Sequence, residues 1–230
     1  MLRPYVSSRK DLDMFSIDLG KYRIIDISYE VVPPGSDDRP FVIERGFLAD
    51  MAYKYDVTKT HSHVGTHVET PAHFFDGGKD VTELPLTTYF GRAILLEVDD
   101  AQKDRAILPP FIEKAIGDII QTGDIVICRN NDKESLMGNR PKPHLTPEAA
   151  QWFKDHRIKM LGIDNNVGLS SDIPTGRKLH DILMGVDVPI IEWPDNLDQI
   201  SKREFYLMSL PFKVKQMDSS WARVIVIEDI

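Results

Sequence analysis

The sequence predicts a single mixed α/β domain, and three observations point to it. The chain has 230 residues, enough to build one substantial hydrophobic core. Hydrophobic residues make up 42% of it and charged residues 28%, as in ordinary globular proteins. In the middle of the chain, strand-like and helix-like segments alternate, which favours a sheet with some parallel pairing. We therefore expect one domain that spans residues 1–230.

Short apolar segments, spread evenly along the chain, predict the strands. They are rich in Ile, Val, Leu or aromatic residues, and most are bounded by Gly, Pro, Asn or Asp. The N-terminal third of the chain looks the most purely β. The predicted strands are Tyr22–Ile27, Phe41–Glu44, Arg92–Val98, Asp124–Cys128, Ile158–Ile163, Val188–Glu192, Phe205–Leu210 and Arg223–Ile227.

Helices are predicted between several of these strands. The segment Pro109–Ile116 begins with proline and is followed by Gly117, which is the usual placement at helix ends. Thr146 is expected to cap a helix that starts at Pro147 and carries an acid in its first turn. A shorter helical turn is expected to end at Gly185.

Charge and cysteine content narrow the classes of function. The single cysteine, Cys128, lies in an apolar run, so we expect a buried hydrophobe rather than a nucleophile, and no intrachain disulfide can form. The chain shows no signal-peptide pattern and no apolar run long enough to span a membrane. Its net charge of −8 disfavours nucleic acid. We expect a cytoplasmic protein that binds neither nucleic acid nor membrane.

A histidine cluster is the strongest chemical signal. Four of the seven histidines fall close together, with one glutamate among them: His61, His63, His67, His73 and Glu69. On a helix, residues 63 and 67 would share a face while 69 and 73 would point to the opposite side. In an extended chain, residues 63, 67, 69 and 73 would all share one face. The β-branched neighbours, together with Gly65 and Pro71, favour the extended segment or loop.

Polar side chains gathered on one face in apolar surroundings need a partner, and a divalent metal is the obvious one. Imidazole and carboxylate together suit zinc, manganese or iron. We expect His61 to have a structural role, and His144 and His156 to be ordinary surface or core histidines. Downstream, His180 precedes a buried strand whose far end carries Glu192. By itself, Glu192 is either a charge at the rim or a ligand.

These residues resemble the cyclase family of metal-dependent hydrolases, which includes bacterial kynurenine formamidases and isatin hydrolases. The family signature is His-x-Gly-Thr-His-x-Asp-x-Pro-x-His. Here it stands as His63-Val-Gly-Thr-His67-Val-Glu69-Thr-Pro71-Ala-His73. The likeness continues through residues 143–153 and 159–164 and the last two predicted strands, so that it covers about Ile24 to Ile227.

The resemblance implies a swivelling β/β/α domain with a mixed sheet, in a homodimer or homotetramer. It implies one or two divalent metals per chain, zinc or manganese. The first would be held by His63, His67 and Glu69, and the second by Glu69, His180 and Glu192. His73 would be the catalytic acid–base residue rather than a ligand.

The implied activity is hydrolysis of a small carbonyl compound at a C–N amide or lactam bond, or at an ester or lactone. Metal-activated water would be the nucleophile, and His73 would protonate the leaving group. Phe74 and Trp221 are candidates for substrate contacts in a pocket that accepts aromatic groups.

Two departures from the family pattern keep alternatives open. Glu69 replaces the usual Asp and is one methylene longer, and Ser219-Ser-Trp221 replaces a Gly-Ser-Pro turn. The change at residue 69 is compatible with a non-catalytic relative that binds metal or ligand. A cupin-type oxygenase is a weaker alternative, because His61-Ser-His63 and Glu69 nearly match its first motif, but it requires an all-β fold.

Overall fold

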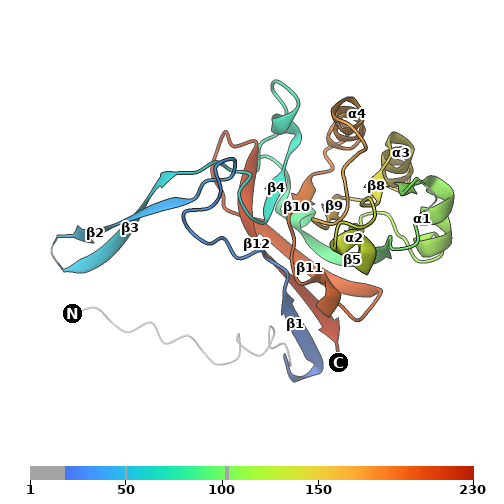
Figure 1. The fold of residues 1–230 in the computed structure, drawn as a ribbon, viewed down its shortest axis with the longest axis horizontal. Helices are drawn as coiled ribbons and strands as arrows, with labels where there is room; N and C mark the ends of the chain where they lie inside the picture. Colours follow the sequence, from blue (N-terminus) through green and yellow to red (C-terminus); the bar gives the residue numbers. More distant parts are fainter. Residues whose placement is uncertain (1–18, 50, 102–103) are drawn as a thin grey trace, which may run out of the picture.

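The body of the protein is built on one eight-stranded mixed sheet (Figure 1). The computed structural model describes residues 19–49, 51–101 and 104–230. The strands follow the order β1-β12-β11-β5-β7-β9-β10-β4. Their bounds are β1 (Tyr22–Asp26), β4 (His67–Glu69), β5 (Phe90–Glu97), β7 (Ile125–Arg129), β9 (Met160–Ile163), β10 (Ile190–Glu192), β11 (Glu204–Pro211) and β12 (Ser219–Asp229).

The sheet closes on itself through β4. One edge of this three-residue strand pairs with β10, and the other pairs with Ser219, Ser220 and Trp221 at the start of β12. Because β12 is 11 residues long, its last part remains available to pair with β1. The result is a barrel-like ring, and its closing strand carries His67 and Glu69 of the histidine motif.

Helices cover the outer face of the parallel part of the sheet (Figure 1). Helix α1 (Pro109–Ile116) connects β5 to β7, α3 (Pro147–Asp155) connects β7 to β9, and α4 (Ile173–Met184) connects β9 to β10. A single turn, α2 (Lys133–Leu136), lies between α1 and α3 in the chain. Parallel strands require crossovers of this kind. The predicted α/β class is confirmed, and the all-β fold of the cupin alternative is wrong.

Two hydrophobic cores lie on opposite sides of the sheet. One is packed between the sheet and the helices and includes Leu96, Cys128 and Phe153. The other is enclosed by the ring and includes Val68 and Val224. Side chains alternate along a strand, so the neighbours of Val68 in β4, His67 and Glu69, point away from the enclosed core, toward the side of the helices.

Each of the eight predicted strands is present, with shifts of a few residues at the ends. The predicted helical turn before Gly185 is the end of α4, which begins earlier because the side chain of Asp172 accepts a hydrogen bond from the Thr175 N–H and caps it. The predicted helices at 109–116 and 147–155 are confirmed, and Thr146 caps the second.

Four strands were not among those predicted. They are β4 (His67–Glu69), where an extended segment or loop was expected, β3 (Ala52–Lys59), β6 (Ala106–Ile107) and β8 (His144–Leu145). The last two are only two residues long and pair with each other. Strand β3 is exposed along its whole length, but Tyr53, Tyr55 and Val57 alternate in sequence with polar residues, so the period-two signal of a strand was present and was missed.

Strand β3 pairs with β2 (Val42–Leu48) in a two-stranded ribbon, here called the arm, that extends away from the body (Figure 1). Large hydrophobic side chains are exposed along β2, β3 and the turn between them: Ile43, Phe47, Leu48, Met51, Tyr53, Tyr55 and Val57. A two-stranded ribbon is marginally stable by itself in water. We therefore expect the arm to be stabilised by packing against a partner.

Within the ranges that the structure describes, no helix has the length and apolar character needed to cross a bilayer. The single-domain boundaries, which include residues 1–18 outside the described residues, and the expected cytoplasmic location stay predictions.

The buried position of Cys128 leads to a prediction about its reactivity. Its side chain is fully buried in the core between sheet and helices, and this burial raises the pKa of its thiol far above the ordinary value. We expect a thiol reagent such as dithionitrobenzoate to leave the native protein unlabelled and to label one thiol per chain in denaturant. Rapid labelling of the native protein would contradict the described packing.

Candidate metal centre

The histidine motif is not one extended strand. Only His67 and Glu69 lie in β4, while His63 lies in the preceding turn and His73 in the 3-10 helix Pro71–His73. The prediction of a shared extended face is therefore right for residues 67 and 69 and wrong for 63 and 73. The chain turns on either side of β4 instead.

The turn before β4 depends on Gly65. Its φ of +66° lies in the left-handed region, and a Cβ there would meet Val31 Cγ2 at 2.4 Å. A side chain at this position would be both strained and crowded, which accounts for the glycine of the motif. The turn brings His63 back toward Glu69.

The carboxylate of Glu69 is the centre of the cluster. Its Oε1 lies 2.8 Å from His63 Nδ1, 3.7 Å from His67 Nε2 and 3.6 Å from His73 Nε2. Its Oε2 lies 3.6 Å from His180 Nε2. Glu192 completes the group, with its Oε2 3.8 Å from His67 Nε2. The structure thus brings together all six residues predicted as metal ligands or as the acid–base residue.

Pairing register and helix packing place the two distant members. Glu192 is the direct partner of His67 in the antiparallel β10–β4 pair, and opposite residues in such a pair point to the same face. His180 lies on the buried side of α4. Two elements far from the motif in sequence therefore add one ligand type each, imidazole and carboxylate.

Backbone contacts orient two of the imidazoles. His67 Nδ1–H donates to the Gly65 carbonyl at 2.8 Å, and His180 Nδ1–H donates to the Gly176 carbonyl at 2.7 Å. With the proton on Nδ1, the lone pair of each ring is on Nε2, the atom that faces Glu69. Metal-binding histidines are characteristically held in this way.

The residues fit a divalent metal. His67 Nε2 and Glu69 Oε2 are buried and have no hydrogen-bond partner, which is costly unless something else satisfies them. Separations of 3.6–3.8 Å are long for hydrogen bonds but suit two ligands that each lie about 2.0–2.2 Å from zinc. Among the described residues, two groups have ligand atoms within 4.8 Å of one another: His63, Glu69 and His73, and His67, Glu69 and Glu192.

The charges of the cluster also call for a cation. Burial alone would raise the pKa of Glu69, but its contacts with His180, His63 and His67 hold that pKa well below the usual value. Burial, together with the negative charge of Glu69, raises the pKa of Glu192. A metal between these carboxylates would remove their mutual repulsion.

Asp218 is a member of the cluster that the sequence analysis missed. His63 Nε2–H donates to Asp218 Oδ2 at 3.0 Å, and His73 Nδ1–H donates to the same oxygen at 2.7 Å. The residue immediately precedes Ser219-Ser220-Trp221, the segment that departs from the family's turn. That departure was the available signal, but only the pairing of β12 with β4 shows what Asp218 meets.

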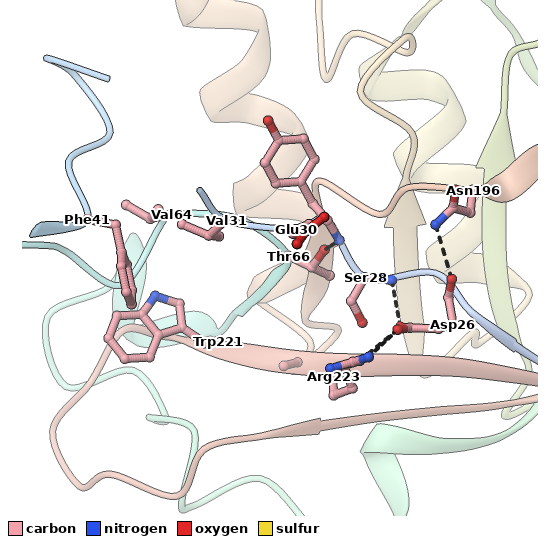
Figure 2. A pocket seen from close by; sticks show the side chains of 12 residues that line it. Asp26, Ser28, Glu30, Val31, Phe41, Val64, Thr66, Asn196, Trp221 and Arg223 are labelled. Atoms are coloured by element: carbon pink, nitrogen blue, oxygen red, sulfur yellow. Dashed lines mark hydrogen bonds and ion pairs between the residues drawn. The ribbon is translucent and has the colours of Figure 1, made fainter. Parts of the chain in front are cut away.

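The remaining candidates lie in different places. Phe74 stacks on the ring of His180 with centroids 4.2 Å apart, and it meets His73 edge-on at 4.5 Å. Trp221 packs against Phe41 and lines a cavity of about 640 Å³ next to the base of the arm (Figure 2). Both roles as substrate contacts stay predictions. His61 binds the Asp38 carbonyl and the His63 N–H, in keeping with a structural role.

Known proteins resemble this chain in sequence and in fold. The family model described as "Putative cyclase" matches residues 24–167. The chain belongs to the cyclase family. The kynurenine formamidase of Geobacillus thermodenitrificans is 26% identical over 214 residues, which cover 86% of this chain and 94% of that protein.

Solved structures share the fold of this cyclase-family chain. Isatin hydrolase A from Ralstonia solanacearum matches with a TM-score of 0.75 at 19% identity, over 99% of this chain and 100% of that one. A protein from Bacillus stearothermophilus described as a metal-dependent hydrolase matches with a TM-score of 0.67 at 22% identity, over 90% and 98%. The predicted family and fold are confirmed, and the chain is an enzyme of the hydrolase class.

The buried, unpartnered ligand atoms predict that metal stabilises the fold. A metal bound only by the native state stabilises it by about 2.7 kcal/mol at a hundred times its dissociation constant. We expect zinc or manganese to raise the melting temperature of the chelator-treated protein, and Glu69→Gln to abolish this rise. Glu148→Gln, an exposed change in the first turn of α3, is the matched control and should keep it. An equal rise in the Glu69 variant would show that metal binds elsewhere.

Proposed function

We propose that the chain is a metal-dependent hydrolase of a C–N amide or lactam bond in a small carbonyl compound. The observation that carries this is the convergence of four imidazoles and Glu192 on the buried carboxylate of Glu69, with ligand atoms left unpartnered. The name formamidase, borne by relatives at 25–26% identity, favours a C–N bond over an ester.

We assign His63, His67 and Glu69 to one metal, and Glu69, His180 and Glu192 to a second. The two oxygens of Glu69 support the sharing, because Oε1 faces His63 and His67 while Oε2 faces His180. A bound metal lowers the pKa of its water from 15.7 to about 7 and polarises the substrate carbonyl. Zinc and manganese both suit imidazole and carboxylate ligands.

His73 is the imidazole best placed to move a proton. Its side chain is 29% exposed, whereas that of His67 is fully buried. Its Nδ1–H is held by Asp218, so Nε2 is the atom directed toward Glu69 and the reacting bond. From there His73 can take a proton from the nucleophile and return it to the leaving nitrogen.

Aromatic groups near the cluster support an aromatic or apolar substrate. Phe74 forms a wall beside His180 and His73. The cavity lined by Phe41, Val64 and Trp221 borders the segment that carries His63 and His67, although no side chain of the cluster lines it, and its volume of about 640 Å³ lies in the usual range for small-molecule pockets (Figure 2).

We further propose that two copies of the chain associate through the arm. The two strands of the arm carry two carboxylates and three cationic side chains, and Asp50 between them in sequence makes residues 42–59 neutral by formal charge, in a chain whose net charge is −8. The arm therefore adds no net negative charge against the acidic body of a second copy, and its exposed Phe47 and Tyr53 offer apolar area to bury. The arm runs directly into the His63 turn, so this interface would lie beside the metal centre.

Replacing His73 tests its role in catalysis. We expect His73→Ala to lower kcat by about 10²–10⁴-fold, the usual contribution of general acid–base catalysis, and to keep the metal content of the wild type. Turnover is measured on aryl formamides, lactams, cyclic imides and lactones, and metal by elemental analysis. His156→Ala, on a ring that stacks on Trp152 outside the cluster, is the control. Unchanged turnover would refute the role, and lost metal would make His73 a ligand.

Charged substitutions in the arm test the association. Phe47 and Tyr53 contact each other with ring centroids 5.1 Å apart, so they form one patch. We expect Phe47→Asp with Tyr53→Asp to convert an oligomer into a monomer in light scattering. Ile173→Asp, at a residue that is 89% exposed on α4, should leave the mass unchanged. A monomeric wild type would contradict the proposal.

A further inference from the structure

One oxygen of Asp218 contacts two imidazoles with different expected roles. Its Oδ2 accepts a hydrogen bond from His63 Nε2–H at 3.0 Å and another from His73 Nδ1–H at 2.7 Å. The two rings lie 4.4 Å apart, tilted by 44°. His63 is a proposed metal ligand and His73 is the proposed acid–base residue, so one carboxylate is hydrogen-bonded to both.

Asp218 is itself fixed from both ends of the histidine motif. Its backbone carbonyl accepts from the Thr70 N–H at 2.9 Å and from Thr70 Oγ1–H at 2.8 Å. Its second carboxylate oxygen, Oδ1, accepts from Ser62 Oγ–H at 3.1 Å. Thr70 follows Glu69 and Ser62 precedes His63, so the carboxylate cannot move without moving the segment that bears the cluster.

We propose that Asp218 is a positioning residue that sets the tautomer and ring orientation of His63 and His73 together. The inference rests on the proposed function, which supplies the roles of the two rings. A neutral imidazole has one protonated and one unprotonated nitrogen, and the bond made by the first decides which atom is left for chemistry.

The two hydrogen bonds select the useful tautomer in each ring. His63 Nδ1 lies 2.8 Å from Glu69 Oε1 and donates a hydrogen bond to it. With Nε2–H held by Asp218, Nδ1 is the nitrogen that would give up its proton and offer its lone pair to a metal beside Glu69. With Nδ1–H directed at Asp218, His73 presents the Nε2 lone pair to the same side. Without the carboxylate, both rings are free to flip or to exchange tautomers, so metal affinity and turnover fall together.

The first test measures metal affinity, which needs no substrate. Outer partners of metal-binding histidines typically contribute 10–100-fold to affinity, so we expect Asp218→Ala to weaken zinc binding by about that factor in competition with a chelator. Asp218→Asn retains a carbonyl oxygen that can accept both bonds, and we expect its loss to be smaller. Asp187→Asn, an exposed carboxylate paired with Lys79, is the isosteric control and should match the wild type.

The second test reads the tautomers directly. Long-range ¹H–¹⁵N spectra of the zinc-loaded protein should show His73 protonated on Nδ1 in the wild type and in Asp218→Asn. In Asp218→Ala we expect a mixture of tautomers. With a hydrolysed substrate in hand, we expect kcat to fall by about 10–100-fold in the Ala variant with little change in KM.

The outcomes separate this inference from the proposed function. Wild-type affinity and an unchanged His73 tautomer in Asp218→Ala overturn the positioning role, as does an equal loss in the Ala and Asn variants. Zinc binding that weakens in the Ala variant, in a protein that hydrolyses none of the substrates, supports the positioning of His63 and instead refutes the proposed activity. Thermal unfolding of the metal-free variants shows whether each one is folded.

Discussion

The site depends on the pairing of a three-residue strand on both of its edges. β4 is hydrogen-bonded to β10 on one side and to the start of β12 on the other, and this pairing closes the ring. Glu192 lies in β10, and Asp218 immediately precedes β12. Both residues lie more than a hundred positions from His67 in sequence, yet register alone brings them to within a few ångströms of the imidazoles.

Without a cation, the burial of Glu69 beside Glu192 has an unfavourable free energy. Glu69 is nearly fully buried, one of its oxygens has no hydrogen-bond partner, and Glu192 adds a second carboxylate beside it. Burying unpaired charge costs several kcal/mol per ion in real proteins, so such a group persists where it has a task. The replacement of Asp by Glu at residue 69 is consistent with that task, because the longer side chain still places both oxygens opposite imidazoles from separate elements.

Much of the fold could be predicted because local sequence patterns mark its strands and helices. Buried strands such as β7 and β9 are runs of Ile, Val, Leu and Cys, and α3 shows its cap, its proline and its acidic first turn. Strand β3 was missed although Tyr53, Tyr55 and Val57 alternate in sequence with polar residues; both of its faces are exposed in the structure, so the alternation marks no core-facing side. The shared face assumed for the histidine motif failed because period-two reasoning holds only within a strand, and Gly65 and Pro71 end the strand.

The residues of the cluster also differ in whether they could be predicted from the sequence. The ligand types within the motif, and the later His180 and Glu192, were predicted from residue identity, spacing and family likeness. Asp218 was not, because no spacing links a residue at the end of the β11–β12 connection to a motif some 150 residues earlier. Its place follows from ring closure, which is a property of the whole sheet.

The ring also divides the chain into parts that evolution can vary freely and parts that it cannot. Residues 212–218, which join β11 to β12, end on the carboxylate that touches two imidazoles, so a residue inserted between Asp218 and Ser219 would move that carboxylate away from the imidazoles. The connections that lead into the helices stand outside this constraint. Diversity in loop length among related enzymes should therefore accumulate around the helical layer, while the step from Asp218 into the last strand keeps a constant length.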